Sequence, residues 1–219
     1  MPRLDLAEAL RYAGVQGDVP DDLRRAMADV ARQVTAIAPR SVWRAFPIRR
    51  EEDRVVLEGS GVALTGRLAE RTLADCGEAA LLLCTLGEPF DALLRREQAR
   101  DMARAVLLDA CGSAWVEAAC DEAEREIARR FPDAFLTDRF SPGYGDLPLE
   151  LQGALCAALD AQRRAGVHMT GSFLLSPSKS VTAVVGLADK PQPARVRGCE
   201  YCHFKENCAL RKGGKTCAV

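Results

Sequence analysis

The chain has 219 residues, enough to bury one sizeable core as one domain with an appendage or as two small domains. Its formal net charge of -1 and isoelectric point near 6.2 argue against a dedicated nucleic-acid-binding protein, which would normally be basic. No stretch approaches the roughly 20 apolar residues of a membrane span, and the N-terminal residues lack the apolar core of a secretory signal. We therefore expect a cytoplasmic protein that binds neither nucleic acid nor membranes.

The apolar pattern predicts a mixture of helices and strands. Residues 21–38 indicate a helix, because apolar side chains recur at helical spacing from Leu23 to Ile37. The apolar run 79–85, which stops before Gly87, is typical of a buried strand. By the same criteria we expect, in chain order, a strand at 54–58, a turn at 59–61, a short helix at 64–76, helices at 88–99 and 101–130, a turn-rich loop at 137–147, a helix at 149–163 and a strand at 181–187.

These elements predict an α+β fold, because the strands do not alternate strictly with the helices. Pro191-Gln-Pro193 interrupts the chain before a basic, cysteine-bearing segment. We therefore expect a main domain over residues 1–190 and a tail over residues 191–219.

The tail holds four of the nine cysteines, Cys199, Cys202, Cys208 and Cys217. Thiolates are soft ligands, and four of them in a short segment can hold one zinc ion or one iron–sulfur cluster. Their C-x2-C-x5-C-x8-C spacing is neither that of a standard zinc finger nor that of a standard ferredoxin, so both remain open. Haem attachment at Cys199–His203 is disfavoured, because it would ordinarily need export and would leave two of the four cysteines unexplained.

The other five cysteines lie among alanines and leucines, where a free thiol behaves as a small hydrophobe. This pattern fits a reducing compartment better than a disulfide scaffold. With only two histidines in the chain, a histidine-based triad or a multi-histidine metal site is also disfavoured.

The loop at residues 138–146 is the first candidate for ligand binding. Arg139 can bind a carboxylate through two hydrogen bonds, and the backbone around Pro142 and Gly143 allows close approach of a ligand. Tyr144 adds an aromatic ring. The alternative is an ordinary surface loop.

Glu117 is the second candidate. It follows the small residues Ala110, Ser113 and Ala114 on one face of the predicted helix 101–130, and Asp121 lies on the same face. A carboxylate in this position could bind a cation or an amino group. The alternative is that Glu117 begins the solvated end of the helix.

Three segments together carry a family resemblance. They are Leu107–Glu117 (Leu-Leu-Asp-Ala-Cys-Gly-Ser-Ala-Trp-Val-Glu), Arg139–Tyr144 (Arg-Phe-Ser-Pro-Gly-Tyr) and Leu174–Gly186 (Leu-Leu-Ser-Pro-Ser-Lys-Ser-Val-Thr-Ala-Val-Val-Gly). In this order they resemble the activation, or reactivation, domain of cobalamin-dependent methionine synthase, in a short stand-alone bacterial form with a C-terminal cysteine cluster. The resemblance implies a mixed, largely antiparallel sheet with long helices.

The resemblance also implies a ligand and its residues. In that family the arginine, the backbone before the glycine and the tyrosine of the loop bind S-adenosylmethionine, which points to Arg139, Pro142, Gly143 and Tyr144. An acid on the helix would be Glu117 or, less favoured, Asp121. The family continues after the tyrosine with a Pro-Ala-Cys-Pro type of segment, whereas this chain has Gly145-Asp-Leu-Pro148.

The resemblance therefore predicts an accessory activation domain or subunit of a cobalamin-dependent methyltransferase, to which no catalytic residue is assigned and for which an enzymatic activity of its own stays open. It would bind S-adenosylmethionine and help to reactivate oxidised cobalamin on a methionine synthase or a related corrinoid protein, with a separate protein as electron donor. The cysteine tail would be an iron–sulfur electron relay. The alternative is a non-catalytic binding module whose tail holds structural zinc.

Overall fold

The computed structural model describes residues 2–15, 17–193 and 212. The chain divides into two compact units. The first comprises Met1–Val42, Leu83–Glu126 and Leu159–Val181, and the second comprises Trp43–Leu82, Ile127–Ala158 and Thr182–Val219. Their boundaries fall inside continuous helices and strands, so several elements contribute residues to both units.

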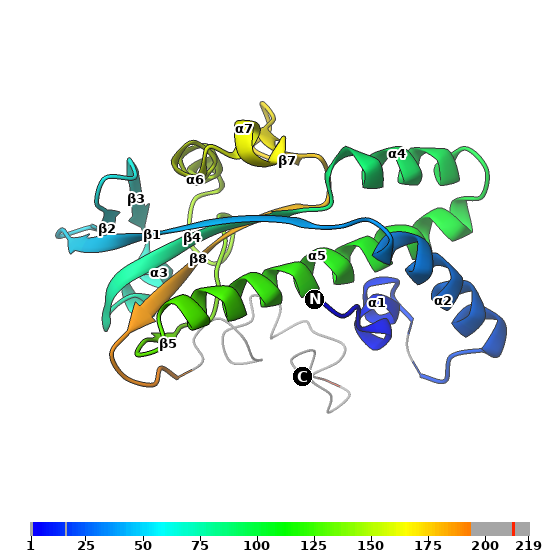
Figure 1. The fold of residues 1–219 in the computed structure, drawn as a ribbon, viewed down its shortest axis with the longest axis horizontal. Helices are drawn as coiled ribbons and strands as arrows, with labels where there is room; N and C mark the ends of the chain where they lie inside the picture. Colours follow the sequence, from blue (N-terminus) through cyan, green and yellow to red (C-terminus); the bar gives the residue numbers. More distant parts are fainter. Residues whose placement is uncertain (1, 16, 194–211, 213–219) are drawn as a thin grey trace. The chain divides into compact units, whose positions relative to one another are not determined.

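The first unit is largely helical (Figure 1). Its elements are α1 (Leu6–Tyr12), α2 (Asp21–Thr35), α4 (Gly87–Gln98), most of α5 (Met102–Arg130), α7 (Ala161–Ala165) and the hairpin of β6 (His168–Met169) with β7 (Leu175–Ser176). Two contacts fix helices in its core. Gly112 of α5 lies directly against the ring of Phe90 of α4, where a side chain at residue 112 would overlap the ring. The indole N–H of Trp115 donates to the carbonyl oxygen of Ile37, just after α2, at 2.9 Å.

Most of the six-stranded sheet belongs to the second unit, and its strand order is β3-β2-β1-β4-β8-β5. The strands are β1 (Arg40–Arg50), β2 (Arg54–Leu57), β3 (Val62–Thr65), β4 (Cys76–Thr85), β5 (Phe135–Leu136) and β8 (Ser180–Ala188). The pairs β1–β2, β2–β3 and β5–β8 are antiparallel. Three short helices complete this unit: α3 (Arg67–Thr72), the 3₁₀ turn η1 (Leu149–Leu151) and α6 (Gln152–Leu159).

The fold confirms the predicted α+β class with a largely antiparallel sheet and long helices. The central strands β4 and β8 are buried over nearly their whole length, as their continuous apolar sequences predict. Within the described residues, no helix carries an apolar stretch long enough to cross a membrane.

Two expectations at the level of single elements were wrong. Residues 64–76 do not form one helix, because β3 pairs with β2 up to Thr65 and Gly66, at a φ of 95°, turns the chain into the shorter α3. The helix expected at 149–163 is divided at Asp160, whose φ of 52° is left-handed. The sequence pattern also missed β1 and α1.

Candidate functional site

The loop that contains Arg139 and Tyr144 is tied to β8 where it begins. The amide of Thr137 donates to the carbonyl oxygen of Gly186 at 3.0 Å, and the Thr137 hydroxyl accepts from the Gly186 amide at 2.9 Å. Phe140 and Val184 exchange two backbone hydrogen bonds of 3.0 and 2.8 Å, and Phe140 is 1% exposed. Arg139 is thus held between two anchored residues.

The second half of the loop is a tight turn. The amide of Tyr144 donates to the carbonyl oxygen of Ser141 at 3.0 Å. The amide of Leu147 donates to the carbonyl oxygen of Tyr144 at 2.9 Å. Gly143 donates to the carbonyl oxygen of Leu147, also at 2.9 Å, and has a φ of 90°, which strongly favours glycine. The buried Leu147 closes the turn on the core side.

Asp146 connects this turn to α3. Its carboxylate accepts the backbone N–H groups of Arg67 at 2.7 Å and of Leu68 at 3.0 Å. These hydrogen bonds, first that of Leu68 and then that of Arg67, lower the pKa of the carboxyl group below its ordinary value of 3.8. The ionised carboxylate therefore stabilises the start of α3 from a position 78 residues further along the chain.

This lowered pKa predicts an acid-dependent contribution to stability. A carboxyl group with a depressed folded-state pKa stabilises the protein above its unfolded-state pKa, about pH 4, and the contribution is lost as the pH falls through the folded-state pKa. Asp146→Asn should therefore be less stable than wild type near neutral pH, and the difference should narrow below about pH 4. Denaturant unfolding of both proteins between about pH 3 and pH 7 measures their free energies of unfolding. A difference in this free energy that does not change with pH would contradict the prediction.

The loop presents the predicted ligand-binding residues in different environments. Pro142 is buried, Arg139 is half-buried, and Gly143 is exposed. Tyr144 is 55% exposed, although the loop around it is anchored on both sides. A fixed turn with an exposed aromatic ring and an approachable backbone is suited to hold a planar group, and a guanidinium nearby is suited to a carboxylate.

Glu117 lies in the part of α5 that belongs to the first unit, whereas the loop belongs to the second. Glu117 and Asp121 are both half-buried. Burial, then the charges of Glu117 and Glu8, raise the pKa of Tyr12 at the end of α1. Asp121 lines a polar cavity of about 550 Å³ together with residues of α1 and the segment before it. The acidic face of α5 is therefore adjacent to α1, a helix that the sequence pattern did not predict.

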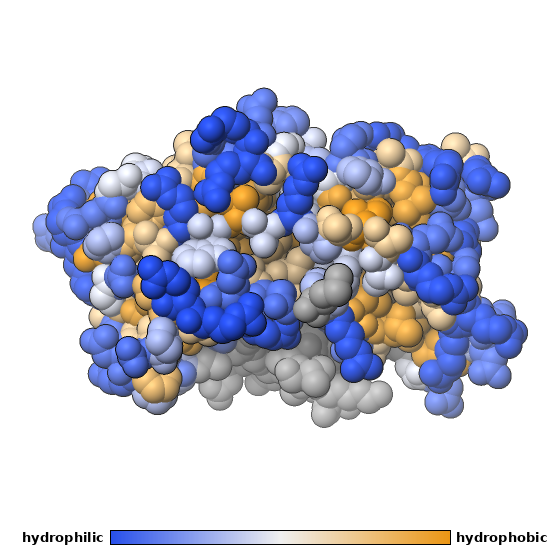
Figure 2. All heavy atoms as spheres, viewed as in Figure 1, coloured by the Kyte–Doolittle hydropathy of each residue, from blue (hydrophilic) through white to orange (hydrophobic). Residues whose placement is uncertain are grey.

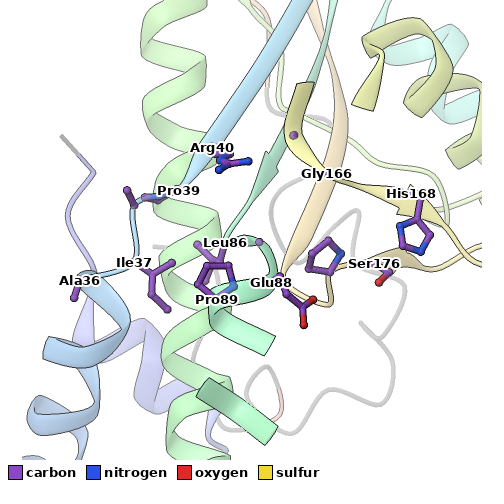
Figure 3. A pocket seen from close by; sticks show the side chains of 14 residues that line it. Ala36, Ile37, Pro39, Arg40, Leu86, Glu88, Pro89, Gly166, His168 and Ser176 are labelled. Carbon is purple, nitrogen blue, oxygen red and sulfur yellow. The ribbon is translucent and has the colours of Figure 1, made fainter. Parts of the chain in front are cut away.

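A second cavity, of about 630 Å³, lies within the first unit (Figure 3). Its mainly apolar wall includes Ile37, Pro39, Leu86, Pro89, Ala165 and Pro177. Figure 2 shows hydrophobic residues at the surface near the start of α4, where several of these residues lie. Arg40, Glu88 and His168 also line the cavity. Because its residues come from separate segments of the chain, no local sequence signal could have indicated it.

The loop before β8, which forms part of this cavity wall, is held by charged hydrogen bonds. Asp91 of α4 accepts from the backbone N–H of Ser178 at 3.0 Å and from its hydroxyl at 2.6 Å. The ammonium group of Lys179 lies 2.9 Å from the carboxylate of Asp109 and 2.9 Å from the hydroxyl of Ser113. Part of the third segment of the resemblance is thereby fixed to α4 and α5.

The four tail cysteines, Cys199, Cys202, Cys208 and Cys217, lie outside the described residues. Within residues 2–15, 17–193 and 212, no group of three or more histidine, cysteine, aspartate or glutamate side chains is arranged to hold a metal ion. Of the five other cysteines, Cys76, Cys84, Cys111 and Cys120 are buried and Cys156 is half-buried. Burial raises the pKa of Cys111 to about 11, which makes this thiol a poor nucleophile and a poor metal ligand near neutral pH.

Comparison with known proteins identifies the fold. No family model and no curated protein matches the sequence. Thirteen chains of solved structures match, and among them is the crystal structure of the MetH reactivation domain bound to AdoHcy, with a TM-score of 0.65. The chain has the fold of the MetH reactivation domain. The alignment covers 96% of this chain and 83% of the reactivation domain, with 15% sequence identity, so the likeness concerns the fold.

Proposed function

We propose that this chain binds S-adenosylmethionine and assists the reductive reactivation of cobalamin on a partner, a cobalamin-dependent methionine synthase or a related corrinoid methyltransferase. The observation that carries the proposal is the anchored Arg139–Tyr144 loop on a fold shared with a domain that binds AdoHcy. The loop has residue types that suit a carboxylate and a planar base, and the hydrogen bonds at its ends would limit the conformational entropy lost on binding.

The donor groups fit the chemistry of the ligand. Arg139 would pair with the carboxylate of the methionine part through two hydrogen bonds. The exposed ring of Tyr144 and the backbone at Pro142 and Gly143 would hold the nucleoside part. Glu117 would accept hydrogen bonds from the amino group, with Asp121 as the less favoured alternative.

Reactivation requires one electron for cob(II)alamin and a methyl group that traps the reduced cobalt. S-Adenosylmethionine would supply that methyl group, its sulfur–methyl bond breaking so that AdoHcy is left, and the chain would bind and orient it without a catalytic residue of its own. The cobalamin belongs to the partner. A separate donor protein would deliver the electron.

We further propose that the chain has a main domain over residues 1–190 and a metal-binding tail over residues 191–219, with Cys199, Cys202, Cys208 and Cys217 as ligands. An iron–sulfur cluster would make the tail an electron relay, whereas zinc would make it structural. Four thiolates carry a charge of about -4, and either centre leaves about -2, so charge does not distinguish them. The basic residues around the cysteines suit both.

A calorimetric titration with AdoHcy tests the binding proposal directly. We expect one site per chain, with S-adenosylmethionine competing for it and with adenosine alone binding more weakly, because adenosine lacks the carboxylate that Arg139 would hold. Wild-type protein that binds neither AdoHcy nor S-adenosylmethionine would contradict the proposed function. The chain would then be a binding module of another kind, and zinc in the tail would favour that alternative.

A further inference from the structure

The end of the proposed ligand loop is attached to a helix that is distant in sequence. Asp146 accepts the N–H groups of Arg67 and Leu68 with both oxygens of its carboxylate, so it occupies the place of a capping side chain for α3. The residue at the N-cap position of α3 itself is Gly66, which has no side chain to offer. The cap that α3 needs is therefore supplied by the loop.

Gly66 makes room for this contact. A Cβ atom at residue 66 would lie 2.8 Å from the backbone oxygen of Asp146 and 2.9 Å from its carboxylate, closer than packed atoms approach. Gly66 also has a φ of 95°, which other residues rarely adopt. The absence of a side chain at residue 66 thus permits both the turn into α3 and the close approach of the loop.

The contact continues into the turn that presents Tyr144. Gly145, at a φ of 55°, lies close to Leu68: a Cβ atom at residue 145 would be 3.4 Å from a methyl carbon of Leu68. On the other side of Asp146, the amide of Leu147 donates to the carbonyl oxygen of Tyr144. The side chain of Asp146 therefore attaches the second half of the loop to α3, while Thr137 and Phe140 attach its first half to β8.

We propose that Asp146 is a positioning residue for the ligand loop, which it fixes by capping α3 without touching the ligand itself. The proposal rests on the proposed function of the loop. It concerns the part of the chain where the resemblance departs from the family, since Gly145 and Asp146 stand where that family has another type of segment. In this chain the carboxylate cap would hold the turn around Gly143 and Tyr144 in its binding conformation.

Asp146→Ala is expected to weaken AdoHcy binding about two- to thirtyfold. This range applies if the whole free energy lost with one helix cap is lost from the binding free energy. Asp146→Asn keeps a side-chain oxygen that can accept one of the two N–H groups, and should restore most of the affinity. A purely electrostatic effect on the ligand would not be restored by asparagine, because the charge is absent in both variants.

Ser60→Ala provides a matched control in the same unit. The Ser60 hydroxyl donates to the carbonyl oxygen of Leu57 at 2.6 Å and accepts from the amide of Val62 at 2.9 Å, so its removal also breaks a local polar contact in a turn. It should lower stability without changing AdoHcy affinity. Hydrogen exchange should accelerate over residues 141–148 in Asp146→Ala and remain as in wild type in Ser60→Ala.

Different results would contradict the positioning role of Asp146 and the proposed function. Wild-type protein that does not bind AdoHcy contradicts both. Wild-type binding with equal affinity in Asp146→Ala, or equal losses in Asp146→Ala and Ser60→Ala, contradicts the positioning role alone. An Asp146→Ala chain that does not fold would also contradict it, because the cap would then support the whole unit rather than the loop. The positioning role is supported if Asp146→Ala loses AdoHcy affinity, Asp146→Asn recovers it, and hydrogen exchange over residues 141–148 is faster in Asp146→Ala.

Discussion

Replacing Arg139 with alanine is expected to weaken the binding of S-adenosylmethionine about ten- to a hundredfold. A hydrogen bond to a charged group contributes roughly 1.5–3 kcal/mol, which corresponds to this range of affinity. The loss should be larger than that in Asp146→Ala, because Arg139 would contact the ligand directly. Calorimetric titration of the two proteins under the same conditions measures the difference.

Two variants separate this effect from a general loss of positive charge. Arg139→Lys keeps the charge but not the planar fork that matches a carboxylate, so it should recover only part of the affinity. Arg163→Ala removes an arginine whose side chain is 83% exposed on α7, and its affinity should match that of wild type. Equal binding by Arg139→Ala and wild type would exclude Arg139 as the residue that holds the carboxylate.

Replacing Cys199 and Cys202 together with serine is expected to remove the proposed metal centre of the tail completely. Two of the four proposed thiolate ligands would be lost, and a hydroxyl group is a much poorer ligand for zinc or for an iron–sulfur cluster. Anaerobically purified wild type should contain one cluster or one zinc ion per chain. A brown protein that contains iron and inorganic sulfide identifies the cluster, and a colourless protein with zinc identifies the structural alternative.

Cys156→Ser is the matched control for this experiment. Cys156 is half-buried, whereas the other four cysteines in the described part of the chain are buried, and burial raises the pKa of Cys156. Its replacement should leave the metal content unchanged. Full metal occupancy in a chain truncated after Pro193 would contradict the assignment of the centre to the tail.

The predictability of the fold depends on how much of each element is buried. The strands β4 and β8 are mainly apolar and are buried over nearly their whole length, so their sequences alone indicate them. In contrast, β1 buries only Val42 and Phe46 among eleven residues. Its arginines interrupt the apolar alternation by which a strand is recognised in a sequence. The strand β3 has only four residues, too few to show a clear alternation in the sequence, and it pairs with β2.

The candidate loop could be predicted as a unit, because its glycine, proline and aromatic residues are adjacent in sequence. What holds the loop could not be predicted. The cap from Asp146 to Arg67 and Leu68 joins residues nearly 80 positions apart, and the bridge from Phe140 to Val184 requires the sheet to be formed. The position of α1 beside the acidic face of α5 was missed for the same reason.

The central claim is that this chain assists the methylation of cobalamin on a partner protein. The most direct test is methyl transfer from labelled S-adenosylmethionine to cobalt, on a cobalamin-dependent methionine synthase whose own reactivation domain has been removed, with one chemical reductant present. We expect labelled methylcobalamin to form with the wild-type chain and not with Arg139→Ala. Equal rates of labelling with and without the chain would contradict the account.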